Sequence, residues 1–141
     1  MKDLIYVVGT AFIEDGKLLI SMSKRSSKKG KYTLVGGGVE LGETFKEAAV
    51  REITEEIANG FEIDEKDLKE ILCFREPALS DPSLTIEMHM MLSSKKIDVE
   101  LLPNEEIISY KWHSIKDSDE HLSSAIKDHF IPWAIENKIM Y

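Results

Sequence analysis

The sequence predicts an α/β fold in which a mixed β-sheet is covered by two helices. Strand-like runs come first, a long helix starts near residue 44, and further strand-like runs precede a final helical segment. This order lacks the repeating strand–helix alternation of a doubly wound parallel sheet. With 141 residues and 43% hydrophobic content, the chain can bury one core but is too short for two ordinary domains, so we expect a single domain over residues 1–141.

Six segments of the sequence predict strands. The first two, residues 4–13 and 17–23, are joined at Glu14-Asp15-Gly16, which is a strong hairpin signal. A short strand over residues 33–35 is expected to lead into a glycine turn. The later strand candidates are residues 68–76, 84–92 and 106–115.

Two segments predict helices. Thr44 or Glu43 can cap a helix start, and no Pro or Gly interrupts the good helix formers that follow until Gly60. Residues 120–137 carry apolar side chains at helical spacing, and we expect Pro132 to kink or restart that helix.

Composition narrows the possible partners and the location. The net charge of −8 argues against binding of a nucleic acid polymer, because such binding depends largely on Lys and Arg contacts with phosphates. No run approaches 18 apolar residues and the start of the chain lacks a secretory signal pattern, so we expect a cytoplasmic protein that does not contact membranes. The single cysteine, Cys73, lies in an apolar stretch and is expected to be a small core residue.

A basic run contrasts with the acidic whole. Residues 24–31 place five cations among eight residues, immediately upstream of the glycines. Lys24 and Arg25 lie nearest the end of a predicted strand, and they are the favoured contacts for a phosphate ligand. The alternative is an ordinary solvated loop.

Three carboxylates follow the glycines at helical spacing. Glu52, Glu55 and Glu56 stand at i, i+3 and i+4, which places them on one face within an arc of roughly 100°. Like charges so close repel one another, and a hard divalent cation such as Mg²⁺ would compensate because it prefers oxygen ligands and substrate phosphates. The alternative is a solvated helix face in which Arg51 pairs with Glu55.

The residues around these carboxylates resemble the Nudix box, the signature of the MutT-like hydrolases. Gly37 is followed by five residues, then Glu43, then seven residues, then Arg51-Glu52-Ile53-Thr54-Glu55-Glu56, so seven defined positions match. The pattern then calls for Gly and an apolar residue where this chain has Ala58 and Asn59. We therefore expect the helix to run half a turn longer here, with Gly60 after its end.

The resemblance implies a fold, a site and a role for each matching residue. The fold is an α/β/α sandwich with a mixed sheet between helices. Glu52 and Glu55, together with Arg51, are expected to be catalytic; Glu52 is the candidate that activates water, while Arg51 and Glu43 tie the glycine loop to the helix. The expected metal ligands are Gly36 through its carbonyl, Glu52, Glu55, Glu56 and Glu106, and the expected substrate-binding residues are Lys24, Arg25, Gly37 and Gly38.

The function that follows is a Mg²⁺-dependent hydrolase, with Mn²⁺ as a possible substitute, that cleaves the diphosphate linkage of a nucleoside diphosphate derivative. Both a nucleoside triphosphate and an ADP-ribose-like substrate fit the sequence. A Nudix-fold nucleotide-binding or regulatory module without turnover is the alternative, and a homodimer is a possible assembly. The sequence also leaves open whether Glu106, Glu105 or Glu87 supplies an extra carboxylate. The aromatic side chains able to stack on a base are Tyr6, Tyr32, Phe74, Trp112 and Trp133.

Overall fold

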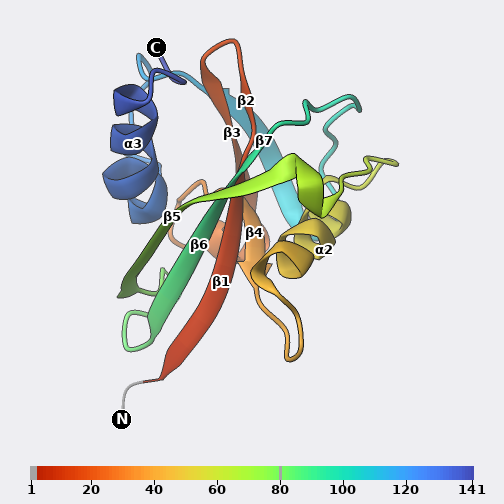
Figure 1. Cartoon of the computed structure of the whole chain (residues 1–141). Coiled ribbons are helices and arrows are strands. Elements are labelled where there is room, and N and C mark those ends of the chain that lie inside the picture. The colour runs from red at the N-terminus through yellow and green to blue at the C-terminus, as the bar shows by residue number, and fades with distance from the viewer. Residues whose placement is uncertain (1–2, 80) are drawn as a thin grey trace.

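Two β-sheets lie between helices in the computed structural model, which describes residues 3–79 and 81–141 (Figure 1). The strands are β1 (Leu4–Ala11), β2 (Ile13–Glu14), β3 (Lys17–Ser23), β4 (Val35–Gly38), β5 (Leu68–Pro77), β6 (Thr85–Ser93) and β7 (Ile107–His113). The helical elements are α1 (Lys24–Ser27), α2 (Phe45–Ile57), the 3₁₀ turn η1 (Glu65–Asp67), the π-helical turn η2 (Ala125–Phe130) and α3 (Ile131–Glu136).

The larger sheet is mixed, as the sequence predicts. Its strand order is β4-β1-β6-β5, with β1 parallel to β6 and the other pairs antiparallel. The smaller sheet has the order β2-β3-β7 and is antiparallel throughout. Figure 1 shows α2 on one side of these sheets and α3 on the other, so the predicted layered α/β arrangement is confirmed.

Separate apolar clusters attach the helices to the two sides. On the α2 side, Ile53 and Ile57 pack with residues of the sheets such as Val8 and Leu19. On the α3 side, Phe130 packs in a second cluster with strand residues such as Met90. Each of these six side chains is at most 1% exposed, so both helical layers are anchored by fully buried groups.

The hairpin between β2 and β3 turns where the sequence predicts. Asp15 and Gly16 have φ angles of 52° and 74°. A two-residue turn with positive φ at both positions matches the right-handed twist of the flanking strands, which explains the Asp-Gly pair.

The expected glycine turn is wrong, because the glycines lie within β4 and pair with β1. A Cβ on Gly36 would lie 2.0 Å from the carbonyl oxygen of Val8, and a Cβ on Gly37 would lie 2.6 Å from Glu52 Oε1. The first distance excludes any side chain at Gly36, because the atom met belongs to the backbone, and a side chain at Gly37 would displace the Glu52 carboxylate. The glycines therefore allow β1 and the start of the site to approach β4 closely.

Helix α2 begins as predicted but ends earlier. Thr44 caps it in a capping box: its hydroxyl accepts from the Glu47 N–H at 3.1 Å, and the Glu47 carboxylate accepts from the Thr44 N–H at 2.8 Å. The expected half-turn extension is wrong. The helix stops at Ile57, and Ala58, Asn59 and Gly60 have φ angles of 52°, 50° and 78°.

The C-terminal segment is helical only from Ala125 onward, so the predicted start at residue 120 is wrong. The π-helical turn η2 is followed by α3, and Pro132 stands in the first turn of α3. The predicted restart at Pro132 is confirmed, since proline lacks the N–H that would continue the preceding turn. Across the part of the chain that the structure describes, no helix is both long enough and apolar enough to cross a membrane.

The prediction that Cys73 is buried is wrong. Cys73 is exposed, because alternation along β5 places it on the face opposite Leu72 and Phe74. Those two neighbours pack into the α3-side cluster instead.

Candidate active site

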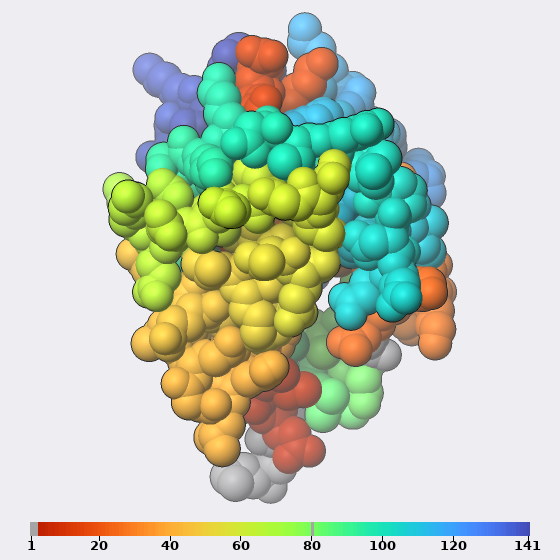
Figure 2. All heavy atoms as spheres, turned by 90° about the vertical axis from the view of Figure 1, so that its right-hand side faces the viewer, coloured from red at the N-terminus to blue at the C-terminus, as the bar shows by residue number. Residues whose placement is uncertain are grey.

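A cavity of about 580 Å³ opens between α2, α1, the glycine strand β4 and the end of β5. At one end it is lined by the glycines Gly36–Gly38 and the three box carboxylates, and at the other by Leu34 and by apolar side chains of β6. Figure 2 looks onto the face that carries α2, drawn in yellow, with the cyan segment near residue 105 beside it and a hollow between them. The cavity thus joins a charged chamber to an apolar one.

Arg51 is the central cation of the charged chamber. Its guanidinium donates to Glu43 Oε2 at 2.7 Å, to Glu52 Oε1 at 2.9 Å and to the Gly38 carbonyl at 2.9 Å. The hydrogen bond from Arg51 holds the pKa of Glu43 below its usual range, and that carboxylate in turn raises the pKa of Arg51. One side chain therefore joins β4, the loop before α2 and the helix itself, as predicted for the Arg51–Glu43 pair.

Glu56 is the buried carboxylate of the site, with 5% of its surface exposed. Its Oε2 accepts from the Gly36 N–H at 2.9 Å. Burial is the largest cause, and the Glu52 carboxylate the next, of a pKa of Glu56 raised to about 9. The negative field of Glu106 acts in the same direction. Without a further cation, this group is driven toward its neutral form.

Glu52 and Glu55 differ in exposure. The Glu52 side chain is 13% exposed and lies against Gly37, whereas the Glu55 side chain is 51% exposed and lies 3.5 Å from Arg51 Nη1. The structure thus brings Glu52 and Glu56 together beside the glycines and leaves Glu55 at the open rim. Within residues 3–79 and 81–141, the carboxylate oxygens of this trio are not all gathered within 4.8 Å of one another.

The loop before β7 supplies two more acids. Glu105 and Glu106 both line the cavity, whereas Glu87 does not. Asn104 shapes this loop: its Oδ1 accepts from the N–H groups of Glu106 and Ile107 at 2.9 Å and 3.0 Å. Its Nδ2 donates to the Glu56 carbonyl at 2.7 Å, which fastens the loop to the end of α2.

The basic run divides into residues that reach the cavity and residues that do not. Lys24 and Arg25, in the short helix α1, line it. The Lys24 N–H also donates to the Glu106 carbonyl at 2.9 Å, so α1 and the acidic loop are held together. Lys31 points elsewhere, since its Nζ donates to the Glu120 carbonyl at 2.7 Å. Lys28 and Lys29 do not line the cavity.

The glycine strand, capped helix and carboxylate cluster are parts of one recognised domain. The family model described as NUDIX domain matches residues 5–134. The chain belongs to the Nudix family. A MutT protein from Methanosarcina mazei shares this fold with a TM-score of 0.72 and 26% identity, over 97% of this chain and 97% of that one.

Two curated relatives match mainly by local sequence. An ADP-ribose pyrophosphatase from Methanocaldococcus jannaschii is 51% identical over 43 residues, which cover 30% of this chain and 25% of that protein. An oxidized purine nucleoside triphosphate hydrolase from Danio rerio is 40% identical over 52 residues, which cover 37% of this chain and 32% of that protein. The matches thus span about a quarter to a third of these relatives.

The donors around Glu56 fit the divalent ions that Nudix hydrolases generally use. All of them are oxygens, from Glu52, Glu55, Glu56, Glu106 and the Gly36 carbonyl, which is the set that hard cations prefer. The pKa of Glu56 is raised chiefly by burial, and the neighbouring Glu52 carboxylate adds to the effect. A divalent cation would offset the charge of these two carboxylates.

The apolar chamber of this Nudix protein holds an acid that sequence reasoning missed. Glu76 lies at the end of β5 with its side chain 14% exposed, where it accepts from Ser124 Oγ at 2.7 Å and lies 3.2 Å from His129 Nε2. Strand alternation could have revealed it, because Glu76 shares a face with the core residues Leu72 and Phe74. Among the described residues that line the cavity none is aromatic, so the five predicted stacking candidates do not reach it.

Proposed function

We propose that this protein is a pyrophosphohydrolase that cleaves the diphosphate linkage of a nucleoside diphosphate derivative by attack of water at phosphorus, with Mg²⁺, or Mn²⁺ in its place. The observation that carries the proposal is the single cavity that joins the carboxylates around Arg51 to an apolar chamber. A diphosphate fits the charged end and an organic moiety the other. Membership of the Nudix family and the pyrophosphatase and nucleotide hydrolase names of the two relatives support it.

Each box residue has a distinct task in this proposal. Glu56, Glu55 and the Gly36 carbonyl hold the cation, and the bound ion supplies charge stabilisation for the phosphoryl oxygens. Glu52 accepts a proton from the attacking water, because it shares the carboxylate face and its Oε1 is fixed by Arg51 at 2.9 Å. Arg51 is a positioning residue, and Glu106 adds a further carboxylate from the opposite wall.

Substrate capture is assigned to the basic wall and the glycines. Lys24 and Arg25 face the charged chamber and offer cations to the phosphates. Gly38 has open space where a side chain would stand, so the backbone at Gly37 and Gly38 can approach the substrate closely.

The far chamber restricts the moiety attached to the diphosphate. Its walls include Leu34, Ile86 and Met88, and Glu76 is its buried acid. A carboxylate held in place by Ser124 accepts hydrogen bonds, so it favours a moiety with amino, ring N–H or hydroxyl donors. Both a nucleoside triphosphate and an ADP-ribose-like substrate meet that requirement.

The test is a panel of nucleoside triphosphates, ADP-ribose and related dinucleotides, with phosphate and nucleotide products quantified. Hydrolysis of at least one compound should disappear in chelator and return with Mg²⁺ or Mn²⁺. Binding without product at any metal concentration would identify a nucleotide-binding module instead, and undiminished turnover in chelator would overturn the mechanism.

The basic wall provides a sharper kinetic test. Neutralising Lys24 and Arg25 together should raise KM about two- to thirtyfold, since each exposed charge contributes about 0.2–1 kcal/mol, while kcat changes less. The matched control neutralises Lys28 and Lys29, which belong to the same basic run but do not line the cavity. Equal KM values for the two double variants would contradict the assignment.

A further inference from the structure

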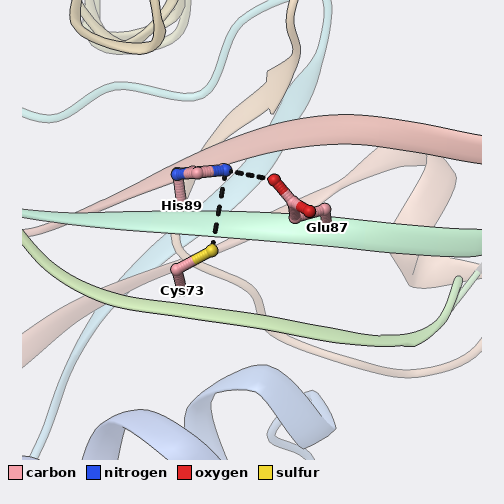
Figure 3. A group of neighbouring side chains, drawn as sticks. All are labelled: Cys73, Glu87 and His89. Carbon is pink, nitrogen blue, oxygen red and sulfur yellow. Dashed lines mark hydrogen bonds and ion pairs between the residues drawn. The ribbon is translucent and has the colours of Figure 1, made fainter.

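A second cluster of metal-binding side chains lies on the face of β5 and β6 that is turned away from α3. Cys73 stands opposite His89 across these strands, and Arg75 stands opposite Glu87. Figure 3 shows Cys73, Glu87 and His89 on the same side of the strands, with the pale blue helices on the other side. None of these residues lines the active-site cavity.

A β-bulge adds a fourth group to this face. Between Glu70 and Leu72 the register shifts, which leaves Ile71 as the extra residue. Without the shift, Glu70 would share the face of Leu72. The bulge returns Glu70 to the face of Cys73 and His89, which is a typical use of such an irregularity.

The distances within the cluster are short. His89 Nε2 lies 2.7 Å from Glu87 Oε2 and 3.7 Å from Cys73 Sγ. The ligand atoms of these three residues all lie within 4.8 Å of one another, and in the described part of the chain no other group of His, Cys, Asp and Glu does so. Two of the three residues make a further contact that fixes their orientation: His89 Nδ1 lies 3.0 Å from Glu70 Oε1, and Arg75 Nε donates to Glu87 Oε1 at 3.0 Å.

The two carboxylates around His89 favour an added positive charge at its ring, either a second proton or a metal ion. A neutral imidazole carries one N–H, yet both ring nitrogens of His89 face carboxylates. One contact would therefore set a lone pair against a carboxylate oxygen unless a second proton or a metal ion intervenes. The ring cannot turn away easily, because it is 7% exposed and stacks on Phe45 with centroids 3.6 Å apart.

We propose that Cys73 Sγ, His89 Nε2 and Glu87 Oε2 bind a zinc ion, with Glu70 and Arg75 as positioning residues. A tetrahedral site built with ordinary Zn–S and Zn–N lengths separates sulfur and nitrogen by about 3.5 Å, close to the 3.7 Å here. The Nε2 and Oε2 atoms must separate from 2.7 Å to about 3.4 Å, which a small rotation of Glu87 provides. Solvent occupies the fourth position, since Cys73 lies at the surface.

Charge and proton balance favour zinc over the hard cation of the active site. On binding, the thiol of Cys73 loses its proton to solvent, the Glu87 carboxylate stays ionised, and His89 binds as the neutral tautomer with Nδ1–H directed to Glu70. The ligands then carry two negative charges, which match Zn²⁺. Sulfur and imidazole are ligands that zinc accepts and magnesium does not prefer. A carboxylate behind a metal-bound histidine is a common arrangement that fixes its tautomer.

The position of the cluster suggests what the ion does. It would fasten β5 to β6 beside Phe45, which is the first residue of α2 and covers the His89 ring. The ion would thus lie at the start of the helix that carries the box carboxylates, with three protein ligands and one position open to solvent.

The single cysteine makes the test direct. The protein is stripped with chelator, desalted, and alkylated at Cys73 with and without Zn²⁺, and Co²⁺ is added separately to look for thiolate-to-cobalt absorption. Zn²⁺ should slow alkylation of the full chain about tenfold or more, because a coordinated thiolate is shielded, and Mg²⁺ should not. Unchanged alkylation with Zn²⁺, or a cobalt spectrum without the thiolate band, would overturn the proposal and leave His89 as an imidazolium between two acids.

Four variants separate this site from the others, with folding checked by circular dichroism. His89→Gln should lose protection by Zn²⁺, and Glu70→Gln should weaken zinc affinity about 10- to 100-fold while keeping the cobalt signature. Two variants are controls that should retain full protection. They are Glu55→Gln, at the active site, and His129→Gln, in η2 on the α3 side of the sheet. Protection that is lost in Glu55→Gln but kept in His89→Gln would refute the site.

Discussion

The two carboxylate-rich clusters of this protein are built in different ways. At the active site, Arg51, Glu52, Glu55 and Glu56 come from one helix, and all the donor atoms are oxygens. On the β5–β6 face, sulfur, nitrogen and oxygen donors come from two strands that pair across the sheet. The difference shows that local helical spacing creates a recognisable motif, whereas strand register creates a cluster with no signature in the sequence.

Each cluster contains one arginine, and the two arginines differ in their contacts and exposure. Arg51 donates hydrogen bonds to three groups from separate segments and its side chain is 24% exposed. Arg75 contacts Glu87 alone among the described acids and its side chain is 61% exposed. One arginine organises a site, and the other orients a single carboxylate.

The largest effect should separate the clusters by activity. Glu52→Gln, Glu55→Gln and Glu56→Gln should each lower kcat by about 10²-fold or more, the size of a lost general base or charge-stabilising group. Glu70→Gln removes a carboxylate from the other cluster and should leave kcat unchanged. Initial rates on the best substrate of the panel measure this difference. Wild-type rates in the three box variants would show that the two clusters do not differ in their importance for activity.

Stability should separate the two arginines. Arg51→Ala should lower the free energy of unfolding by about 2–3 kcal/mol, because it leaves Glu43 and Glu52 without their charged hydrogen-bond donor. Arg75→Ala should cost less than about 1 kcal/mol, as expected for a solvent-exposed ion pair. Urea unfolding of both variants at neutral pH provides the measurement, and equal losses would show that Arg51 does not organise its surroundings.

The pH dependence of stability should have opposite signs at the two clusters when chelator is present. The pKa of Glu56 is raised from 4.5 to about 9, chiefly by burial, so the folded state binds its proton more tightly and this stability falls as pH rises between those values. The pKa of Glu87 is lowered, chiefly by its hydrogen bond with His89, so its contribution falls as pH drops below about 4.5.

Unfolding curves over this pH range, compared with Glu56→Gln and Glu87→Gln, reveal the two slopes. Glu56→Gln should remove the fall in stability as pH rises, and Glu87→Gln should remove the fall as pH drops. A Glu56→Gln profile parallel to that of the wild type above pH 5 would show that this carboxylate is not perturbed.

The smallest effect concerns the end of α2. Ala58 has φ 52° and ψ −146°, a conformation that suits glycine and strains any residue with a Cβ. Ala58→Gly should therefore raise the free energy of unfolding by about 1 kcal/mol without changing kcat. Thr54→Gly, inside the same helix, is the contrasting control and should be destabilising by a few tenths of a kcal/mol, about the difference between the helix propensities of Thr and Gly. Destabilisation by Ala58→Gly would show that the strain is absent.

Sequence reasoning succeeded where the relevant spacing is local. The carboxylate face of α2, the Thr44 cap and the Asp15-Gly16 turn each depend on residues within four positions of one another. It also placed Glu106, Lys24 and Arg25 around one cavity, although their roles stay predictions. The mixed sheet followed from element order and from the family resemblance.

The failures have physical causes that lie outside local spacing. Glycines usually indicate turns, yet Gly36 is required inside a strand because a Cβ there would strike the Val8 carbonyl. Ala58 adopts a conformation that its own propensity opposes. The apolar neighbours of Cys73 suggested burial, but they lie on the other face of β5. The bulge at Ile71, which gathers Glu70 with Cys73, depends on pairing between strands and cannot be read from either strand alone.

The Asn104 side chain couples two parts of the cavity wall. Its amide bonds at once to the Glu56 carbonyl, at the end of α2, and to two N–H groups of the loop that carries Glu106. Of these three bonds, the one from Asn104 Nδ2 to the Glu56 carbonyl crosses from the loop to the helix. An outward displacement of the loop would therefore break that bond or draw the end of α2 with it.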